Sequence, residues 1–419
     1  MANKKIQLIK GLVFILSVIF VLSSCSKQGS KKQTQTAKEI KGITVNDNKA
    51  LSSYMREANK AFKRAKEAPA SDFIYGLTDL GDGVVIKKYI KKKSDEDVEI
   101  IIPSEIEGMP VVELADDAFN RSIVKTVVIP DSILRIGESL FSYSVQLKYV
   151  KLLAQITSLP EDIFQNCESL EYFDIPSHIT NIESGAFFKS GLRAIEIPET
   201  VTFKSFSFGK EINSMSVFGY CKNLEYVSLP NTMTILPDGF FKGCASLKNI
   251  KLPLSIEIIE DCVFEKCTSL EYVDLPASLV SIGNAFEECG IKSLIIPDSV
   301  TDCNKLQLST CKQLESLTLP NNMTEIKNSL LQPYEEYQRC SNLKSINFPK
   351  SLTKIEYEAF YKLSSLGEII IPENLTSVEF KTNDFGDTRA FWGTSLPLRT
   401  QAKLKQLGYT GEFTFNYLQ

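Results

Sequence analysis

The phrase NCESLEYFDIP at residues 166–176 returns almost unchanged as KCTSLEYVDLP at residues 266–276. Each copy closes with Ile, Leu or Phe followed by proline, and such prolines recur along most of the chain: Pro103, Pro130, Pro176, Pro198, Pro230, Pro253, Pro276, Pro297, Pro320, Pro349 and Pro372. Most copies lie 21 to 23 residues apart, and Leu153 stands midway in the double gap between Pro130 and Pro176. A period near 23 predicts a solenoid of stacked coils instead of several globular domains.

Each copy follows the pattern P-x-S-[ILV]-x-x-I-G-x-x-A-F-x-x-C-x-x-L-x-x-[VI]-x-[IL]-P. The final segment alternates apolar and polar residues, which predicts a short strand that the proline ends. Stacking then aligns equivalent residues in columns, so the aromatic position predicts one buried phenylalanine column. Its members are Phe119, Phe141, Phe164, Phe187, Phe218, Phe241, Phe264, Phe286 and Phe360. Since one coil alone cannot bury its ring, stability is expected to depend on neighbouring coils.

This repeat resembles the BspA-like leucine-rich repeat, over residues 103–397. The resemblance implies an α/β-type repeat solenoid, built mostly of short parallel β-strands, with caps at both ends. Residues 50–102 resemble an N-terminal helix and hairpin cap, and residues 398–419 resemble a short C-terminal cap. The resemblance also implies a bacterial surface or periplasmic protein that adheres to or binds other molecules, without naming a ligand.

The first 24 residues have the features of a secretory signal peptide. Lysines precede the short apolar run GLVFILSVIFVL, and small residues follow it. LSSC at residues 22–25 resembles the lipobox of bacterial lipoproteins, which implies lipidation of Cys25 and a membrane anchor in the outer membrane or at the cell surface. Residues 25–49 contain few large apolar residues and are predicted to form a flexible tether. Good helix formers over residues 50–68, with Leu51, Met55 and Phe62 near one face, predict a helix that Pro69 ends.

Seven of the ten cysteines share one position, three residues after the aromatic column: Cys167, Cys221, Cys244, Cys267, Cys289, Cys311 and Cys340. Other copies have Ser144, Ser190, Leu363 or Thr394 there, so we interpret the position as a core position that accepts side chains of small or modest size. The seven are predicted to be free thiols, because parallel side-chain directions in adjacent coils would strain a disulfide.

No catalytic or cofactor-binding pattern is present. The chain has one histidine, His178, which is expected in an exposed turn, and Cys303 falls in an apolar column. Cys262, at a variable position, is the best candidate for a reactive thiol. Zinc, calcium-loop and phosphate-loop motifs are missing from the sequence, so no metal or cofactor is expected. A net charge of -4 excludes the basic surface typical of nucleic-acid binders.

The candidate ligand-binding residues lie at alternate strand positions, which are expected to face solvent in ladders. One ladder includes Tyr149, Tyr172, Tyr226 and Tyr272, and the next includes Lys151, Asp174, Lys251 and Asp274. Tyrosine is enriched at recognition surfaces, although tyrosines and paired charges also suit exposed strands without any ligand. Two overlong copies add further candidate contacts, Phe206 and Phe208 in one and Tyr334 and Tyr337 in the other.

These features predict an exported, lipid-anchored, non-enzymatic protein that binds a host, matrix or envelope protein or glycan through its strand face. The alternative is a structural or assembly component of the cell envelope without an external ligand.

Overall fold

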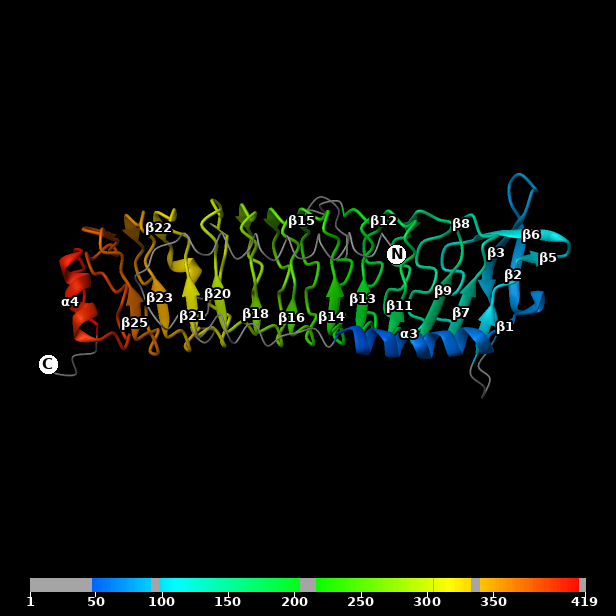
Figure 1. The fold of residues 1–419 in the computed structure, drawn as a ribbon, viewed down its shortest axis with the longest axis horizontal. Coiled ribbons are helices and arrows are strands. Elements are labelled where there is room, and N and C mark those ends of the chain that lie inside the picture. Colours follow the sequence, from blue (N-terminus) through cyan, green and yellow to red (C-terminus); the bar gives the residue numbers. More distant parts are fainter. Residues whose placement is uncertain (1–46, 92–97, 204–215, 304, 333–339, 414–419) are drawn as a thin grey trace, which may run out of the picture. The chain divides into compact units, whose positions relative to one another are not determined.

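The computed structural model describes residues 47–91, 98–203, 216–303, 305–332 and 340–413. Residues 51–419 form one compact unit, in which successive coils stack side by side (Figure 1). The fold is a parallel-strand solenoid of about 12 turns of roughly 23 residues, which confirms the predicted repeat architecture.

One line of strands corresponds to the alternating segment before each proline. Its members pair in parallel within three successive sheets and stand in one row in Figure 1. They are β1 (Lys66–Glu67), β4 (Glu99–Ile101), β7 (Thr126–Ile129), β9 (Tyr149–Leu152), β11 (Tyr172–Phe173), β13 (Ala194–Glu196), β14 (Tyr226–Ser228), β16 (Asn249–Ile250), β18 (Tyr272–Val273), β20 (Ser293–Ile295), β21 (Ser316–Thr318), β23 (Ser345–Asn347) and β25 (Glu368–Ile370).

A second line of two-residue strands was not predicted. It forms at the isoleucine of the I-G segment, where the sequence pattern indicated only a turn. Its members are β8 (Arg135–Ile136), β10 (Ser158–Leu159), β12 (Asn181–Ile182), β15 (Ile235–Leu236), β17 (Ile258–Ile259), β19 (Ser281–Ile282), β22 (Glu325–Ile326), β24 (Lys354–Ile355) and β26 (Glu379–Phe380). Two residues are too few to show alternation, so their pairing arises only when coils stack at strand spacing.

The phenylalanine column is present and its nine predicted members are all buried. From Phe119 to Phe286, each ring lies 5.2 to 6.0 Å from the ring of the next coil, measured between centroids. Leu308 then takes the equivalent place, three residues before Cys311, and is fully buried. The rings therefore form a continuous stack through the centre of the first eight coils that carry them.

The turn around each column phenylalanine requires left-handed backbone on both sides of the ring. The residues two before and two after the phenylalanine have positive φ in coil after coil, as at Ser139 (53°) and Tyr143 (60°) around Phe141. Gly239 and Gly243 occupy the same two places around Phe241. Glycine adopts this conformation without strain, so the repeat stores modest backbone strain wherever another residue stands there.

The N-terminal end contains the helix α3 (Asp47–Arg64), a one-turn helix η2 (Ala70–Asp72) and two hairpins. The hairpins are formed by β2 (Phe73–Leu77) with β3 (Val84–Tyr89) and by β5 (Glu105–Ile106) with β6 (Met109–Leu114). α3 ends earlier than predicted, because residues 66–67 leave the helix to pair in parallel with β4.

At the other end, α4 (Leu398–Gln406) lies after the last coil, and η3 (Asn328–Leu330) belongs to an overlong copy. Among the residues that the structure describes, no helix combines the length and apolarity that a bilayer crossing requires.

Candidate functional site

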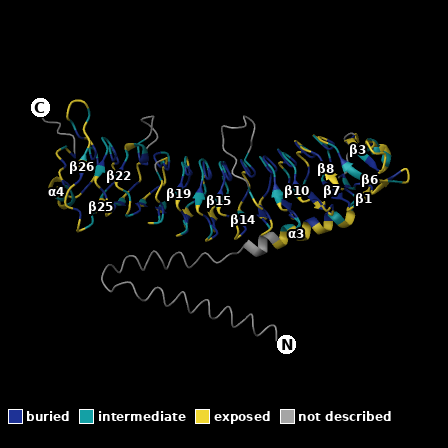
Figure 2. Ribbon diagram, turned by 90° about the horizontal axis from the view of Figure 1, so that it is seen from above, coloured by how far each residue is buried: buried dark blue, intermediate teal, exposed yellow. Residues whose placement is uncertain are grey.

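The first part of the tyrosine ladder is covered by α3. The helix lies along the first residues of β9, β11 and β13, with most of its own surface facing outward (Figure 2). Ala58 and Ala61 of α3 form a small apolar cluster with Tyr149, Tyr172 and Ala194, separate from the main core. Tyr149 and Tyr172 are each only 8% exposed, so the expectation that they face solvent is wrong.

The helix face that makes these contacts includes the predicted Phe62 but not Met55, which is 38% exposed. Ala58 and Ala61 are buried, and Tyr54 and Phe62 are partly buried. Positions 54, 58, 61 and 62 form a helical stripe that was not predicted from the sequence, because alanine is a weak hydrophobic signal.

Cations beside the tyrosine ladder contact the two aromatic residues of α3. The Arg193 guanidinium lies 5.5 Å from the Tyr54 ring centroid, and the Lys151 ammonium lies 5.9 Å from that of Phe62. Burial raises the pKa of the Tyr172 hydroxyl, and the nearby carboxylates of Asp174 and Glu196 raise it further. The ladder under α3 therefore carries neutral phenols and is flanked by charges on both sides.

Beyond α3 the strand face is open. We call the outward residues of β18, β20, β21, β23 and β25 the open strand face; they are Tyr272, Ser293, Ile295, Ser316, Thr318, Ser345, Asn347, Glu368 and Ile370. Tyr272, Ile295 and Ile370 are 46%, 64% and 59% exposed. From β20 to β23 these outward positions hold no charged residue. The face therefore offers apolar and hydroxyl groups to solvent.

The remaining ladder candidates have mixed environments. Tyr226 is half-buried and packs against the α3 cluster. Lys151, Asp174, Lys251 and Asp274 are all exposed. The loop candidates Phe206, Phe208, Tyr334 and Tyr337 lie outside the described residues.

The charged ladder at the edge of the strand face pairs within itself. Four ion pairs join adjacent coils, with N···O distances of 2.6 to 2.9 Å: Lys148–Glu171, Arg193–Glu225, Lys292–Glu271 and Lys344–Glu315. This confirms the interpretation that alternating charges here pair across strands. Exposed pairs of this kind contribute little stability, about 0 to 1 kcal/mol each.

The seven cysteines of the repeat column are buried free thiols. In five of the seven the thiol also donates a hydrogen bond to the carbonyl of the preceding coil's column phenylalanine; these five are Cys167, Cys221, Cys244, Cys267 and Cys311. Cys167 Sγ lies 3.1 Å from Phe141 O, and Cys267 Sγ lies 3.2 Å from Phe241 O. Ser144 makes the equivalent bond with its hydroxyl, 2.7 Å from Phe119 O. Cysteine and serine interchange here because both are small donors.

Three further residues singled out from the sequence are Cys262, Cys303 and His178. Burial, and next the adjacent Glu265 carboxylate, raise the pKa of the Cys262 thiol to about 12, which disfavours the thiolate form that a reactive cysteine needs. Cys303 packs against the core as predicted. His178 is half-buried instead of exposed, and its Nε2 lies 3.2 Å from the Ala154 carbonyl oxygen.

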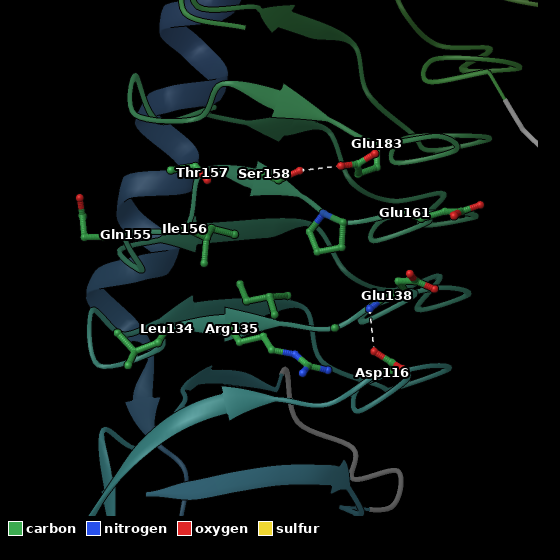
Figure 3. A pocket seen from close by; sticks show the side chains of 13 residues that line it. Asp116, Leu134, Arg135, Glu138, Gln155, Ile156, Thr157, Ser158, Glu161 and Glu183 are labelled. Carbon is green, nitrogen blue, oxygen red and sulfur yellow. Dashed lines mark hydrogen bonds between the residues drawn. The ribbon is translucent and has the colours of Figure 1, made fainter. Parts of the chain in front are cut away.

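An open depression of about 620 Å³ lies along the second strand line, at β8, β10 and β12 (Figure 3). Two of its four acidic side chains accept structural hydrogen bonds: Asp116 Oδ1 accepts from the Glu138 amide at 3.0 Å, and Glu183 accepts from the Ser158 hydroxyl at 3.0 Å. No group of three or more metal-ligating side chains occurs in the part of the chain that the structure describes.

Comparison with known proteins agrees with the geometry. A leucine-rich repeat protein from Bacteroides ovatus ATCC 8483 shares 24% identity over 83% of this chain and 99% of its own, with a TM-score of 0.56. A leucine-rich cell surface protein from Faecalibacterium prausnitzii A2-165 shares 21% identity over 81% and 97%, with a TM-score of 0.47. The pneumococcal vaccine antigen PcpA shares 22% identity over 74% and 85%, with a TM-score of 0.44.

No curated protein matches the sequence significantly. The family model described as the BspA type leucine-rich repeat region matches residues 88–214, 210–335 and 332–384. The chain belongs to the BspA-type leucine-rich repeat family.

Proposed function

We propose that this chain is an exported, lipid-anchored, non-enzymatic protein that binds a protein or glycan through the open strand face. Leucine-rich repeat proteins are generally binding modules, and the BspA-type family suggests an adhesin-like role. The observation that carries the proposal is the exposure of Tyr272, Ile295 and Ile370 on one strand face, whose outward positions from β20 to β23 hold no charged residue.

Such a face has the chemistry of a recognition surface. Exposed tyrosine and isoleucine supply apolar area that a ligand removes from water, at about 25 cal/mol per Å². Ser293 and Ser316, whose hydroxyl oxygens lie 2.7 Å apart, supply donors and acceptors between them. The ion pairs Lys292–Glu271 and Lys344–Glu315 immediately precede strands of this face and supply polar groups along one edge of it, where protein interfaces typically carry polar residues.

The test is a matched pair of triple variants of residues 26–419, assayed by surface plasmon resonance against purified extracellular-matrix proteins and glycans. Tyr272→Ser, Ile295→Ser and Ile370→Ser together are expected to weaken binding by about 100-fold, because they remove the apolar centre of the surface. The control changes Leu134, Leu254 and Val280 to Ser; these are exposed apolar residues outside the strand lines, and binding is expected to stay within about twofold. Equal loss in both variants would contradict the assignment to the strand face.

The lipid anchor of the proposal rests on the lipobox resemblance at Cys25. In cells labelled with radioactive palmitate, the wild-type chain is expected to incorporate label and sediment with membranes. Cys25→Ala is expected to lose both properties, because a chain without acyl groups lacks the partitioning energy of about 0.8 kcal/mol per buried methylene. A Cys25→Ala chain that still sediments with membranes would refute the anchor.

The alternative is a structural or assembly component of the cell envelope. The rim of paired charges and the exposed strands suit that role equally well if the bound surface is another envelope component. Protease treatment of intact cells separates the two, since a surface adhesin is cleaved and a periplasmic component is protected.

A further inference from the structure

The contact between α3 and the solenoid is narrow. Of the α3 residues 52–64, whose burial the structure describes, Ala58 and Ala61 alone are fully buried, at 2% and 1% exposure; Tyr54 and Phe62 flank them on either side of the alanine stripe. The residues between them along the helix point to solvent. Alanine lets the helix backbone approach the tyrosine rings closely, and the two aromatic residues meet Arg193 and Lys151 on opposite edges of the ladder.

The strands under α3 do not depend on it for their hydrogen bonds. β9 pairs in parallel with β7 on one side and with β11 on the other. The core-facing residues Val150 and Phe173 belong to the main core cluster, whereas the α3 contacts form a cluster of their own. Removing α3 would therefore expose Tyr149 and Tyr172 without leaving any sheet hydrogen bond unmade.

The polar attachments of α3 are concentrated at its C-terminal end. Arg64 donates two hydrogen bonds to the Glu99 carboxylate, at 2.9 and 2.5 Å. Residues 66–67 then pair with β4, and the Ala68 amide donates to Ile101 O at 3.0 Å. Toward the other end, Tyr54 contacts Arg193, which also pairs with Glu225. The helix is thus fixed by hydrogen bonds near Arg64, whereas near Tyr54 it is held by the contact with Arg193 and by the apolar cluster that includes Ala194.

We propose that the first residues of β9, β11 and β13 form a helix-binding seat, and that α3 occupies it as an intramolecular ligand. A partner protein that presents an amphipathic helix with the same stripe displaces α3 and binds the seat. The stripe needs two small residues at the centre and an aromatic residue toward each end, positioned for Arg193 and Lys151. This goes beyond the proposed function, which concerns the open strand face, and does not rest on it.

The seat favours a helical partner because the α3 side chains that contact it have the spacing of one helix face. Two small residues three apart, with aromatic residues four before the first and one after the second, share one side only at helical periodicity. The floor consists of tyrosine rings and Ala194, which offer apolar area and no unpaired charge. The residue pattern of α3 is therefore a template for the helix that the partner would present.

The experiment uses the chain of residues 26–419 and a fluorescent peptide of residues 47–66 as the probe, followed by fluorescence anisotropy. In the Ala58→Asp/Ala61→Asp chain, carboxylates replace the two buried alanines and release α3 from its seat. This chain is expected to bind the peptide, and the wild-type chain is expected to bind it about tenfold more weakly or worse, because only molecules with an open seat are competent. A peptide with the same two substitutions is expected not to bind.

The matched control is Met55→Asp/Asn59→Asp, which places two carboxylates on the outward side of the same helix. It is expected to behave as the wild-type chain does. Failure of the peptide to bind the Ala58→Asp/Ala61→Asp chain, while the strands of the solenoid keep their wild-type amide protection, would overturn the proposal. Equal binding to the wild-type and released chains would overturn it as well.

Hydrogen exchange of the wild-type chain provides a second, mutation-free measurement. Amides of residues 54–64 are expected to exchange about 100-fold faster than those of β9 and β11, through local opening of α3. If α3 amides exchange only at the rate of the strands beneath them, the helix does not leave its seat and the proposal fails.

Discussion

Replacing Phe264 with alanine is expected to lower the free energy of unfolding by about 3 to 5 kcal/mol. The Phe264 ring is fully buried between the rings of Phe241 and Phe286, at centroid distances of 6.0 and 5.5 Å. Truncation removes apolar burial and leaves a cavity that the closed coils above and below cannot fill. Urea unfolding followed by circular dichroism measures the loss.

Phe385→Ala is the matched control, because the same atoms are removed from a side chain that is 93% exposed. Its unfolding free energy is expected to stay within about 0.5 kcal/mol of wild type. In a solenoid each coil contacts only its neighbours, so Phe264→Ala should reduce amide protection most in the coils of Phe241 and Phe286. A loss spread evenly to the coil of Phe119 would contradict the nearest-neighbour account.

Gly191→Ala is expected to cost about 3 kcal/mol or more, through overpacking against backbone. A Cβ at Gly191 would lie 2.0 Å from the carbonyl oxygen of Glu168 and 2.6 Å from its carbonyl carbon. These atoms cannot turn aside as a side chain would, and the Gly191 amide already donates to Cys167 O at 3.0 Å. Thermal unfolding of the two proteins measures the difference.

Gly367→Ala tests whether the Gly191 effect is steric. A Cβ at Gly367 would meet no atom closer than 3.9 Å, so the change is expected to be neutral within about 1 kcal/mol. Similar losses at both positions would contradict the steric account, because the entropy effect of a Gly→Ala change favours the folded state. Gly290 repeats the geometry of Gly191, with its Cβ position 2.1 Å from Thr268 O, and Gly290→Ala should behave like Gly191→Ala.

Features that repeat with the 23-residue period were predictable from sequence. The buried position of Phe264 follows from the recurrence of phenylalanine in the same place of most copies, since any residue in that column has equivalent neighbours above and below. The same logic identified the cysteine column as core and the strand before each proline. The periodicity argument has a limit at Cys267. It indicated that a small side chain fits there, but it did not reveal that the thiol donates a hydrogen bond to Phe241 O.

Features that occur only once in the chain do not follow from the repeat, so only the tertiary structure could locate them. α3 occurs once, and its contact with the ladder joins residues far apart in sequence, such as Tyr54 and Arg193. The ladder pattern makes Tyr149 and Tyr272 equivalent, yet Tyr149 is buried and Tyr272 is 46% exposed.

The sequence by itself determined the coil, its columns and the family. Each repeat is surrounded by copies of itself, so the repeating pattern also specifies the neighbours of every residue in it. Only the tertiary structure decided which part of the strand face is free to bind. A single helix with an alanine stripe covers one stretch of an otherwise uniform ladder, and no local pattern specifies where such a helix docks. The physical reason is that coil stacking is a nearest-neighbour interaction, whereas the docking of α3 is a long-range contact between two weakly apolar surfaces.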